Sequence, residues 1–484
     1  MSAGSLDRLE PALLWHWFLE VCSVPRESGA EERMSDFLER FASDRALECL
    51  RDRVGNVLIR KPASGSRSAS VALQAHTDMV AESLPGIGHD FSRDPIVPFV
   101  EEGSWVTARG TTLGADNGMG VAAMLTLLDS EGITHPPLEC LFTVDEERGM
   151  VGARQLDPSW LCSRRLINLD SESDTTFFIG CAGGHDTTIT ASFESCPIPS
   201  GLLLREVSVE GLRGGHSGVA IDREGANAIC LLSRALSGLP ETMGLHLVGM
   251  GNPGRSNVIP VSASAAVALP ERVLPKLEAF LLRKLEEFRT EYRNADDGIL
   301  MTCRDREAQA GSCLTYSGTR RALDLLLAVP HGVTRMSSVT PGLVETSTNL
   351  SGVVLEGPVL TIFTSQRSSL DPAREDLYAR LAAIARLAGG SAEISMEYPG
   401  WNPDPGAGLV RLAVSTFEEL FGIEPTLLSV HAGLECGMFA RKVPGLEMLS
   451  IGPEIRRVHT PEERLSIGST QRFWRLLLRL LERV

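Results

Sequence analysis

The stretch that decides the fold is "VALQAHTDMV", residues 71–80, in which an apolar run leads straight into His76, Thr77 and Asp78. Side chains on a strand alternate between its two faces, so we expect His76 and Asp78 to point the same way. A carboxylate beside an imidazole fixes the tautomer of the ring and raises its basicity, as a metal-binding histidine requires. For this stretch alone, the alternative is a polar pair where a strand ends at the surface.

Two later apolar runs also end on acidic residues. "LECLFTV" (138–144) runs into an acidic triplet that includes Glu146 and Glu147, and "RRLINLD" (164–170) ends on Asp170. The stretch "NGMGVAAMLTLLD" is expected to form a helix directly after an aspartate. Strands that alternate with helices predict a largely parallel α/β sheet, in which ligands gather beyond the carboxyl ends of the strands. Neighbouring strands would therefore bring these polar groups to one edge of the sheet.

The composition limits the classes of protein and of partner. At 484 residues the chain exceeds one ordinary core, so two domains are expected. Its hydrophobic share of 43% and charged share of 22% are typical of globular proteins, and the net charge of -16 argues against nucleic acid or an anionic membrane as a partner. The sequence has no signal-peptide pattern, no apolar run near the ~20 residues of a membrane span, and no C-x-x-C pair among its ten cysteines. These features predict a reduced, soluble, cytoplasmic protein.

The character of the sequence changes twice along the chain. Residues 1–186 and 395–484 are expected to form one discontinuous α/β catalytic domain with a mostly parallel central sheet. Residues 187–394 interleave strand-like and helical segments and are expected to form an inserted α+β lid domain. The terminal segment "STQRFWRLLLRLLERV" spaces its apolar residues as one buried helix face, which indicates a structural role.

The candidate metal ligands are two imidazoles and three carboxylates, namely His76, Asp116, Glu147, Asp170 and His459. This set suits a pair of Zn²⁺ ions. Two-metal hydrolases hold their ions roughly 3.5–4 Å apart and use one carboxylate as a bridge. With Asp116 as the bridge, each ion keeps one histidine and one further carboxylate. A shared water then becomes the nucleophile once its pKa falls toward ~7.

The doubled glutamate in "TVDEERG" fits this scheme. Adjacent residues on an extended segment point in different directions, so one glutamate can bind a metal while the other faces the water. A carboxylate over that water can take its proton and pass it to a leaving amine. The alternative is a solvated acidic loop. The interpretation rests on the order and placement of the motifs together.

The chain closely resembles the aminoacyl-histidine dipeptidases, also called cytosol non-specific dipeptidases or bacterial peptidase D. These belong to the two-zinc metallopeptidase family that also holds aminoacylases and carnosinases. The resemblance covers nearly the whole chain, and the motifs that carry it are "DRVGNVLIRKPA", "LQAHTDMV", "GTTLGADNGMGVAAML", "DEERGMVGA", "INLDSE", "GCAGG", "GGHSG", "SNVIP", "GLVETSTNL", "YPGW", "HAGLECG" and "SIGP…HTPEERLSI".

The resemblance implies a metal role for each matching position. His76 and Asp170 would be terminal ligands of one ion, Glu147 and His459 those of the other, and Asp116 the bridge. It also implies a cis peptide bond after the bridging aspartate. Two zinc ions per subunit are expected, Mn²⁺ or Co²⁺ being able to substitute, in a protein that we expect to be a homodimer.

Three catalytic residues complete the expected site. The resemblance makes Glu146 the general base and Asp78 the carboxylate that orients His76. A Gly-flanked histidine such as His216 in "GGHSG" is by itself more often a turn residue. In related enzymes, a histidine of the lid stabilises the oxyanion, which favours that role for His216. Whether it acts within its own subunit or in the partner's site stays open.

Four further residues are candidates for substrate binding. Asn257 in "SNVIP" is either a donor to the substrate or a cap at a strand end, and Arg335 either binds a substrate carboxylate or forms a surface ion pair. His431 and Glu435 belong to "HAGLECG". We expect Glu435 to hold the free ammonium of the substrate, with a structural role as the alternative.

The expected function is metal-dependent hydrolysis of Xaa-His and other unblocked dipeptides. The nearest rival is an N-acyl amino acid deacylase with the same di-zinc core. A rival of another class is a non-catalytic metal-binding relative, which would be expected to have lost Glu146 or one of the ligands. The preferred dipeptides are left open.

Overall fold

The computed structural model of the chain describes residues 6–65, 69–307, 311–338, 340 and 342–484. The chain divides into two compact units, each described here by itself. The first unit comprises Met1–Cys181, Trp401–Ser429 and Leu434–Val484. The second comprises Ala182–Gly400 and Val430–Gly433. The role of the second unit as a lid stays a prediction.

The first unit is built around an eight-stranded sheet in the order β1-β2-β6-β3-β7-β23-β8-β22. Its strands are β1 (Glu48–Arg51), β2 (Val57–Lys61), β3 (Val71–His76), β6 (Leu138–Thr143), β7 (Arg165–Asn168), β8 (Thr176–Cys181), β22 (Thr426–Val430) and β23 (Glu447–Ser450). The four central strands, β6, β3, β7 and β23, are parallel to one another. Strand β1 pairs antiparallel with β2, β2 with β6, and β8 with β23. The predicted α/β fold class is confirmed, and the parallel part of the sheet is its centre.

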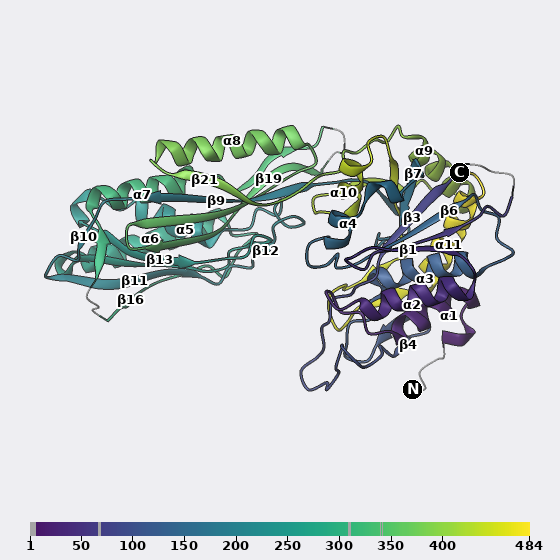
Figure 1. Cartoon of the computed structure of the whole chain (residues 1–484). Helices are drawn as coiled ribbons and strands as arrows, with labels where there is room; N and C mark the ends of the chain where they lie inside the picture. Colours follow the sequence, from purple (N-terminus) through teal and green to yellow (C-terminus); the bar gives the residue numbers. More distant parts are fainter. Residues whose placement is uncertain (1–5, 66–68, 308–310, 339, 341) are drawn as a thin grey trace. The chain divides into compact units, whose positions relative to one another are not determined.

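The central strands are buried on both faces, as their continuous apolar runs predict. Every residue of β3 and of β6 is buried. The helices of this unit are α1 (Ala12–Ser23), α2 (Glu32–Asp44), α3 (Ala115–Asp129), α4 (Val151–Gln155), α9 (Gly408–Phe421), α10 (Glu435–Lys442) and α11 (Ile467–Leu481). Helices α1, α2 and α3 gather on one side of the sheet (Figure 1). The sheet and the helices α1, α2, α3, α9 and α11 contribute to one hydrophobic core.

A small four-stranded sheet, in the order β24-β25-β5-β4, completes the first unit. Its strands are β4 (Pro98–Glu101), β5 (Trp105–Ala108), β24 (Ile455–Arg456) and β25 (Arg464–Ser466). The segment between β24 and β25 contains His459. Because β25 pairs with β5, this sheet anchors that segment to the N-terminal part of the chain.

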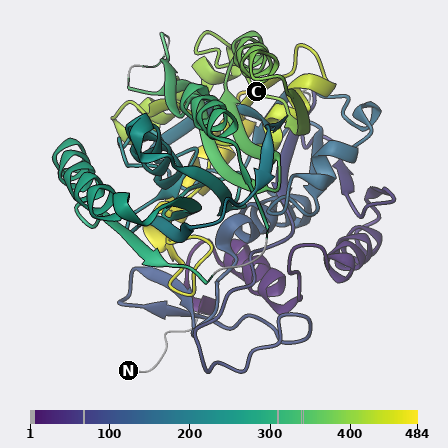
Figure 2. The same ribbon diagram turned by 90° about the vertical axis from the view of Figure 1, so that its left-hand side faces the viewer.

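The second unit contains a nine-stranded sheet in the order β16-β11-β15-β13-β19-β20-β9-β21, with β18 paired to β19. Its ribbon is drawn in Figure 1 and, turned by 90°, in Figure 2. These strands are β9 (Gly183–Ser192), β11 (Leu202–Glu210), β13 (His246–Asn252), β15 (Ala263–Pro270), β16 (Leu300–Asp305), β18 (Gly332–Met336), β19 (Val344–Glu356), β20 (Val359–Ser368) and β21 (Ser391–Tyr398). Four helices pack in one core with this sheet, namely α5 (Ala228–Ser237), α6 (Leu274–Glu291), α7 (Tyr316–Ala328) and α8 (Asp371–Leu387).

Two short strand pairs belong to the second unit. They are β10 (Ser195–Pro197) with β17 (Ser312–Leu314), and β12 (Gly215–His216) with β14 (Val258–Ile259). The second pair carries the "GGHSG" and "SNVIP" motifs, which lie far apart in the sequence. Within the described part of the chain, no helix is long and apolar enough to cross a membrane.

Candidate metal centre

The candidate ligands of the first unit meet at the carboxyl edge of the parallel strands. His76 is the last residue of β3, and it lies opposite Thr143, the last residue of β6. Asp170 follows β7, the other neighbour of β3. Because parallel strands end at the same edge, the segments after β3, β6 and β7 are brought together. This is the convergence that the sequence predicts for the first unit.

His76, Asp116 and Asp170 form one group whose ligand atoms all lie within 4.8 Å of one another. The Nε2 atom of His76 lies 3.1 Å from Asp116 Oδ1 and 3.3 Å from Asp170 Oδ1. Asn117 donates from Nδ2 to Asp170 Oδ1 over 2.6 Å, which holds that carboxylate in place. The peptide bond between Asp116 and Asn117 is cis, as the resemblance implies.

Asp116, Glu147 and His459 form a second group under the same distance limit. The Nε2 atom of His459 lies 3.3 Å from Asp116 Oδ2 and 2.8 Å from Glu147 Oε1. The backbone of His459 has a φ of 61°, in the left-handed region that a histidine rarely adopts. Asp116 thus turns one oxygen toward each histidine, which is the arrangement that a bridging carboxylate needs.

The electrostatics of the two groups favour bound positive charge. Burial opposes a charge on His459, yet the carboxylates of Asp116 and Glu147 raise its pKa to about 11. Burial raises the pKa of Asp170 to about 6, and the neighbouring Asp116 contributes to that rise. Three carboxylates in a partly buried space are costly unless cations neutralise them. Two histidines and three carboxylates are also a donor set that Zn²⁺ accepts, so these residues fit a pair of divalent metal ions.

Asp78 lies behind His76. Its Oδ1 atom is 3.4 Å from Nδ1 of His76, and it also accepts the backbone N–H of Glu146 over 3.0 Å. Its Oδ2 atom accepts from the backbone N–H of Glu147 and from Ser28 Oγ. Burial alone would raise the pKa of Asp78, but the hydrogen bonds with His76 and its other partners lower it to about 2. An ionised Asp78 therefore joins the ring of His76 to the loop between β6 and α4, residues 144–150, which carries Glu146 and Glu147. We call this segment the glutamate loop.

Glu146 and Glu147 each form part of a group with candidate ligands. Burial raises the pKa of Glu146 well above its usual value, and the carboxylates of Asp170 and Glu147 add to this effect. A glutamate with a raised pKa can both take and release a proton near neutral pH. This environment suits a general base.

Two residues outside the predicted site hold the segment that precedes Asp116. Glu463 is buried, and its carboxylate accepts the backbone N–H groups of residues 113–116 over 2.8 to 3.3 Å. Arg26 is also buried, and it donates to the backbone oxygens of Thr77, Asp78 and Gly114. Glu463 lies in the "HTPEE" motif, so its closeness to His459 in sequence was a usable signal. Arg26 lies in no recognised motif.

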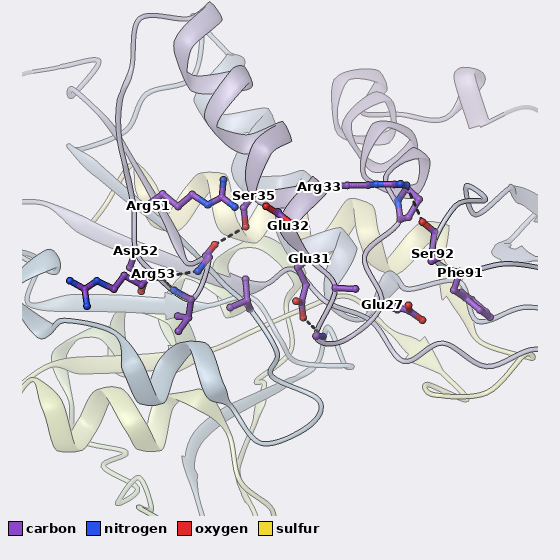
Figure 3. Close-up of a pocket in the computed structure, with 16 residues that line it drawn as sticks. Glu27, Glu31, Glu32, Arg33, Ser35, Arg51, Asp52, Arg53, Phe91 and Ser92 are labelled. Atoms are coloured by element: carbon purple, nitrogen blue, oxygen red, sulfur yellow. Dashed lines mark hydrogen bonds between the residues drawn. The ribbon is translucent and has the colours of Figure 1, made fainter.

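A cavity of about 450 Å³ in the first unit lies beside the loop that carries Glu146 and Glu147 (Figure 3). Glu31 lines it and accepts the backbone N–H groups of Gly29 and Asp145. Glu31, Asp78 and Asp145 form a further acidic group. Their carboxylates already accept hydrogen bonds or, for Asp145, pair with Arg148. We therefore read this group as support for the glutamate loop.

His216 lies in the second unit, so the structure does not include it in the cluster of the first unit. Its Nδ1 atom accepts the backbone N–H groups of Gly218 over 3.1 Å and of Val219 over 3.4 Å. Burial, together with the charge of Arg367, lowers its pKa. The ring is therefore neutral near neutral pH, with its proton on Nε2. A neutral ring with a free Nε2–H is a hydrogen-bond donor.

The second unit also holds three of the predicted substrate-binding residues. Asn257 is exposed beside β14, whose Val258 pairs with His216, so these two residues are neighbours. Arg335 forms an ion pair with Glu345, Nε to Oε1 over 3.1 Å. His431 is buried, and its Nε2 lies 2.7 Å from Ser347 Oγ. The exposed Arg335 side chain already has a protein partner.

Glu435 differs from the sequence expectation in its surroundings. Its side chain is 0% exposed, and its Oε2 atom accepts from Gln74 and Thr143 inside the first unit. A carboxylate held in this way offers no accessible atom to a substrate ammonium. The alternative that the sequence left open, a structural role, is the one that these contacts favour.

The chain is similar to known proteins over nearly its whole length. The family model described as Peptidase family M20/M25/M40 matches residues 72–483. The cytosol non-specific dipeptidase of Escherichia coli (strain K12) is 37% identical over 483 residues, which are 99% of each chain. The crystal structure of an aminoacylhistidine dipeptidase from Vibrio alginolyticus is 37% identical, with a TM-score of 0.89 over 99% of this chain and 98% of that one. The aminopeptidase PepT from Bacillus cereus ATCC 10987 shares the fold, with a TM-score of 0.56 and 17% identity over 98% of both chains.

Proposed function

The chain belongs to peptidase family M20/M25/M40, and on that premise we propose that it is a metal-dependent dipeptidase that hydrolyses Xaa-His and other unblocked dipeptides. The observation that carries the proposal is the position of Asp116, which turns one oxygen to His76 and the other to His459. The similarity of the chain to a cytosol non-specific dipeptidase, over 99% of both sequences, supports the substrate class.

We propose that His76, Asp116 and Asp170 hold one divalent ion and that Asp116, Glu147 and His459 hold the other. Zinc suits this donor set, and Mn²⁺ or Co²⁺ can substitute. When bound, such ions polarise the scissile carbonyl and lower the pKa of a nucleophilic water. Asp78 keeps His76 in the tautomer that directs Nε2 toward Asp116 and Asp170.

Glu146 is the proposed general base. Its carboxylate takes a proton from the attacking water and gives it to the amine of the leaving amino acid. The hydrogen bond from its backbone N–H to Asp78 fixes the start of the glutamate loop. The two neighbouring glutamates then have separate functions, because Glu147 is directed toward His459.

His216 is the proposed donor to the oxyanion. Its Nδ1 atom is occupied by backbone N–H groups, which leaves the Nε2–H free to donate. Such a donor stabilises the charge that develops on the carbonyl oxygen in the transition state.

We propose that Asn257, Arg335 and His431 of the same unit contact the substrate. We also propose that the protein is a cytoplasmic homodimer. The name of the Escherichia coli relative, a cytosol dipeptidase, supports the cytoplasmic location.

A direct test is dipeptide hydrolysis with controlled metal content. Chelation should abolish cleavage of free dipeptides, and Zn²⁺, Mn²⁺ or Co²⁺ should restore it. Full activity of a preparation that elemental analysis finds free of metal would refute the proposal. Equal turnover of free and N-acetylated dipeptides would favour the deacylase. Metal binding with no hydrolysis across a dipeptide library would favour the non-catalytic relative.

A further inference from the structure

A buried carboxylate of the first unit joins α10 to two strands of the central sheet. Glu435 is the first residue of α10, and its side chain is 0% exposed. Its Oε2 atom accepts from Gln74 Nε2 over 2.5 Å and from Thr143 Oγ1 over 2.8 Å. Gln74 belongs to β3 and Thr143 to the neighbouring β6. The helix is thereby hydrogen-bonded to the middle of the sheet.

The hydrogen bonds continue to a third strand. Gln74 Oε1 accepts from Asn168 Nδ2 over 2.6 Å, and Asn168 is the residue of β7 that lies opposite Gln74. Gln74 also donates to Thr143 Oγ1 over 3.0 Å. Glu435, Gln74, Thr143 and Asn168 are all buried. One connected polar network therefore spans β6, β3 and β7, which are neighbours in the sheet.

Each strand member of this network lies just before a residue of the proposed site. Gln74 precedes His76 by two positions on β3, so their side chains share a face of the strand. Asn168 is the last residue of β7 and precedes Asp170 by two positions. Thr143 lies opposite His76 and is followed three positions later by Glu146. The network thus lies beneath the strand ends that deliver these three residues.

We propose that Glu435 is a positioning residue that, through Gln74, Thr143 and Asn168, fixes the carboxyl ends of β3, β6 and β7 at the spacing that the metal ligands and Glu146 require. This inference rests on the proposed function. It assigns Glu435 an action through its neighbours, with no contact to the substrate.

The energetics of burial support this role. Removal of the carboxylate would leave one N–H of the buried Gln74 amide without its acceptor. Thr143 Oγ1 would keep only its longer contact to the backbone oxygen of Ala75, at 3.4 Å. Burial raises the pKa of Glu435 to about 8, so a neutral side chain is compatible with the site near neutral pH. Its second oxygen, Oε1, and Asn168 Oδ1 are buried acceptors without a hydrogen-bond partner among the described residues. A glutamine at position 435 preserves the shape and one acceptor, so it should replace the glutamate.

The experiment compares Glu435→Ala and Glu435→Gln with the matched control Glu139→Ala. Glu139 is a buried glutamate of β6 at the opposite end of the strand, where it accepts from the backbone N–H groups of Cys162 and Ser163. The first measurement is Zn²⁺ affinity of the full chain, by competition with a chromophoric chelator. The second is kcat and KM for a free dipeptide and for its analogue without the α-amino group.

In Glu435→Ala we expect Zn²⁺ affinity to fall about 10–100-fold, the range seen when groups that orient metal ligands are lost. We expect kcat to fall with KM within about threefold, to the same extent for both substrates. Glu435→Gln should recover affinity and kcat to within about fivefold of the wild type, because the acceptor is restored. Glu139→Ala should retain wild-type Zn²⁺ affinity.

Three results would overturn the proposal. The first is an unchanged Zn²⁺ affinity in Glu435→Ala, and the second is an equal loss of Zn²⁺ affinity in Glu139→Ala. The third is a rise in KM, in both Glu435→Ala and Glu435→Gln, that occurs only for the substrate with a free ammonium. If Glu435→Ala does not fold, Thr143→Val removes one donor at constant volume, and unchanged affinity there also counts against the role. If the wild type binds Zn²⁺ but cleaves no dipeptide, the proposed function fails while the affinity comparison still decides the positioning role.

Discussion

At the scale of single residues, Asp116 connects the two halves of the candidate centre. Its two oxygens face different histidines, and the segment before it is held by the carboxylate of Glu463. A bridging ligand has to be fixed more firmly than a terminal one, because a shift of its carboxylate changes both sites at once. Buried hydrogen bonds from several backbone N–H groups provide such a constraint.

The paired glutamates should separate catalysis from metal binding. Glu146→Ala should retain two metal ions per chain and lose about 10²–10⁴-fold in kcat, because only the proton transfer is removed. Glu147→Ala should lose affinity at one site. Metal counting by elemental analysis on dialysed protein decides between the roles. If Glu146→Ala loses an ion and Glu147→Ala keeps both, the two assignments must be exchanged.

His216 should affect the transition state more than substrate binding. We expect His216→Ala to keep both ions, to hold KM within a few-fold and to lose about 10²–10³-fold in kcat, the usual cost of one oxyanion donor. His246→Ala, in the same unit, is the control. Near-wild-type kcat in His216→Ala would exclude His216 from the mechanism. If the protein is a dimer, mixing His216→Ala with Glu146→Ala subunits restores activity only when the histidine acts in the partner's site.

At the scale of elements, the glutamate loop is closed by a tight contact at the start of α4. The backbone N–H of Gly152 donates to Val144 O over 2.9 Å, and Asn56 Nδ2 donates to Gly152 O over 3.0 Å. A Cβ atom at Gly152 would lie 2.3 Å from Asn56 Oδ1 and 2.6 Å from Val144 O. The loop that carries Glu146 and Glu147 therefore needs a glycine at its far end.

Gly152→Ala should displace this loop. We expect a loss of about 1–3 kcal/mol in the free energy of unfolding, the usual cost of overpacking, and weaker metal binding at the site of Glu147. The control is Gly132→Ala, because a Cβ atom at Gly132 meets nothing within 4 Å. Unfolding in urea and metal counting are the measurements. Equal stability and metal content in the two variants would contradict the packing argument.

At the scale of the whole molecule, the first unit is completed by segments from both ends of the sequence. Leu477 of α11 is 0% exposed and belongs to the same core as Leu14 and Phe18 of α1. The six tryptophans of the chain all lie in this unit, namely Trp15, Trp17, Trp105, Trp160, Trp401 and Trp474. Tryptophan fluorescence therefore reports the unfolding of the first unit alone.

Leu477→Ala should destabilise the first unit by about 2–5 kcal/mol, the range for a leucine truncated in a core. The control in the same unit is Leu84→Ala, whose side chain is 43% exposed and should have little effect. Urea unfolding followed by tryptophan fluorescence measures the difference. A midpoint for Leu477→Ala equal to that of the control would show that α11 is not needed by the core.

The sequence by itself determined the local elements and the types of residue at their ends. The apolar run at 71–76 is β3, and the apolar segment at 117–129 lies within α3. Hydrophobic period and the position of polar residues are properties of short segments, so they can be read without a structure. The clustering of polar residues at strand ends follows from the same pattern and from the general rule for parallel sheets.

Only the tertiary structure decided which buried groups support the site. Glu435 bonds to Gln74 across 361 positions, and Glu463 bonds to Leu113 across 350. The sequence pattern was compatible with a substrate contact for Glu435, whereas its burial and its partners point to the interior. Such pairs depend on which strand lies beside which and on the direction of each side chain. The packing of distant segments determines the order of the strands and the direction of each side chain. The hydrophobic pattern of a short segment contains neither.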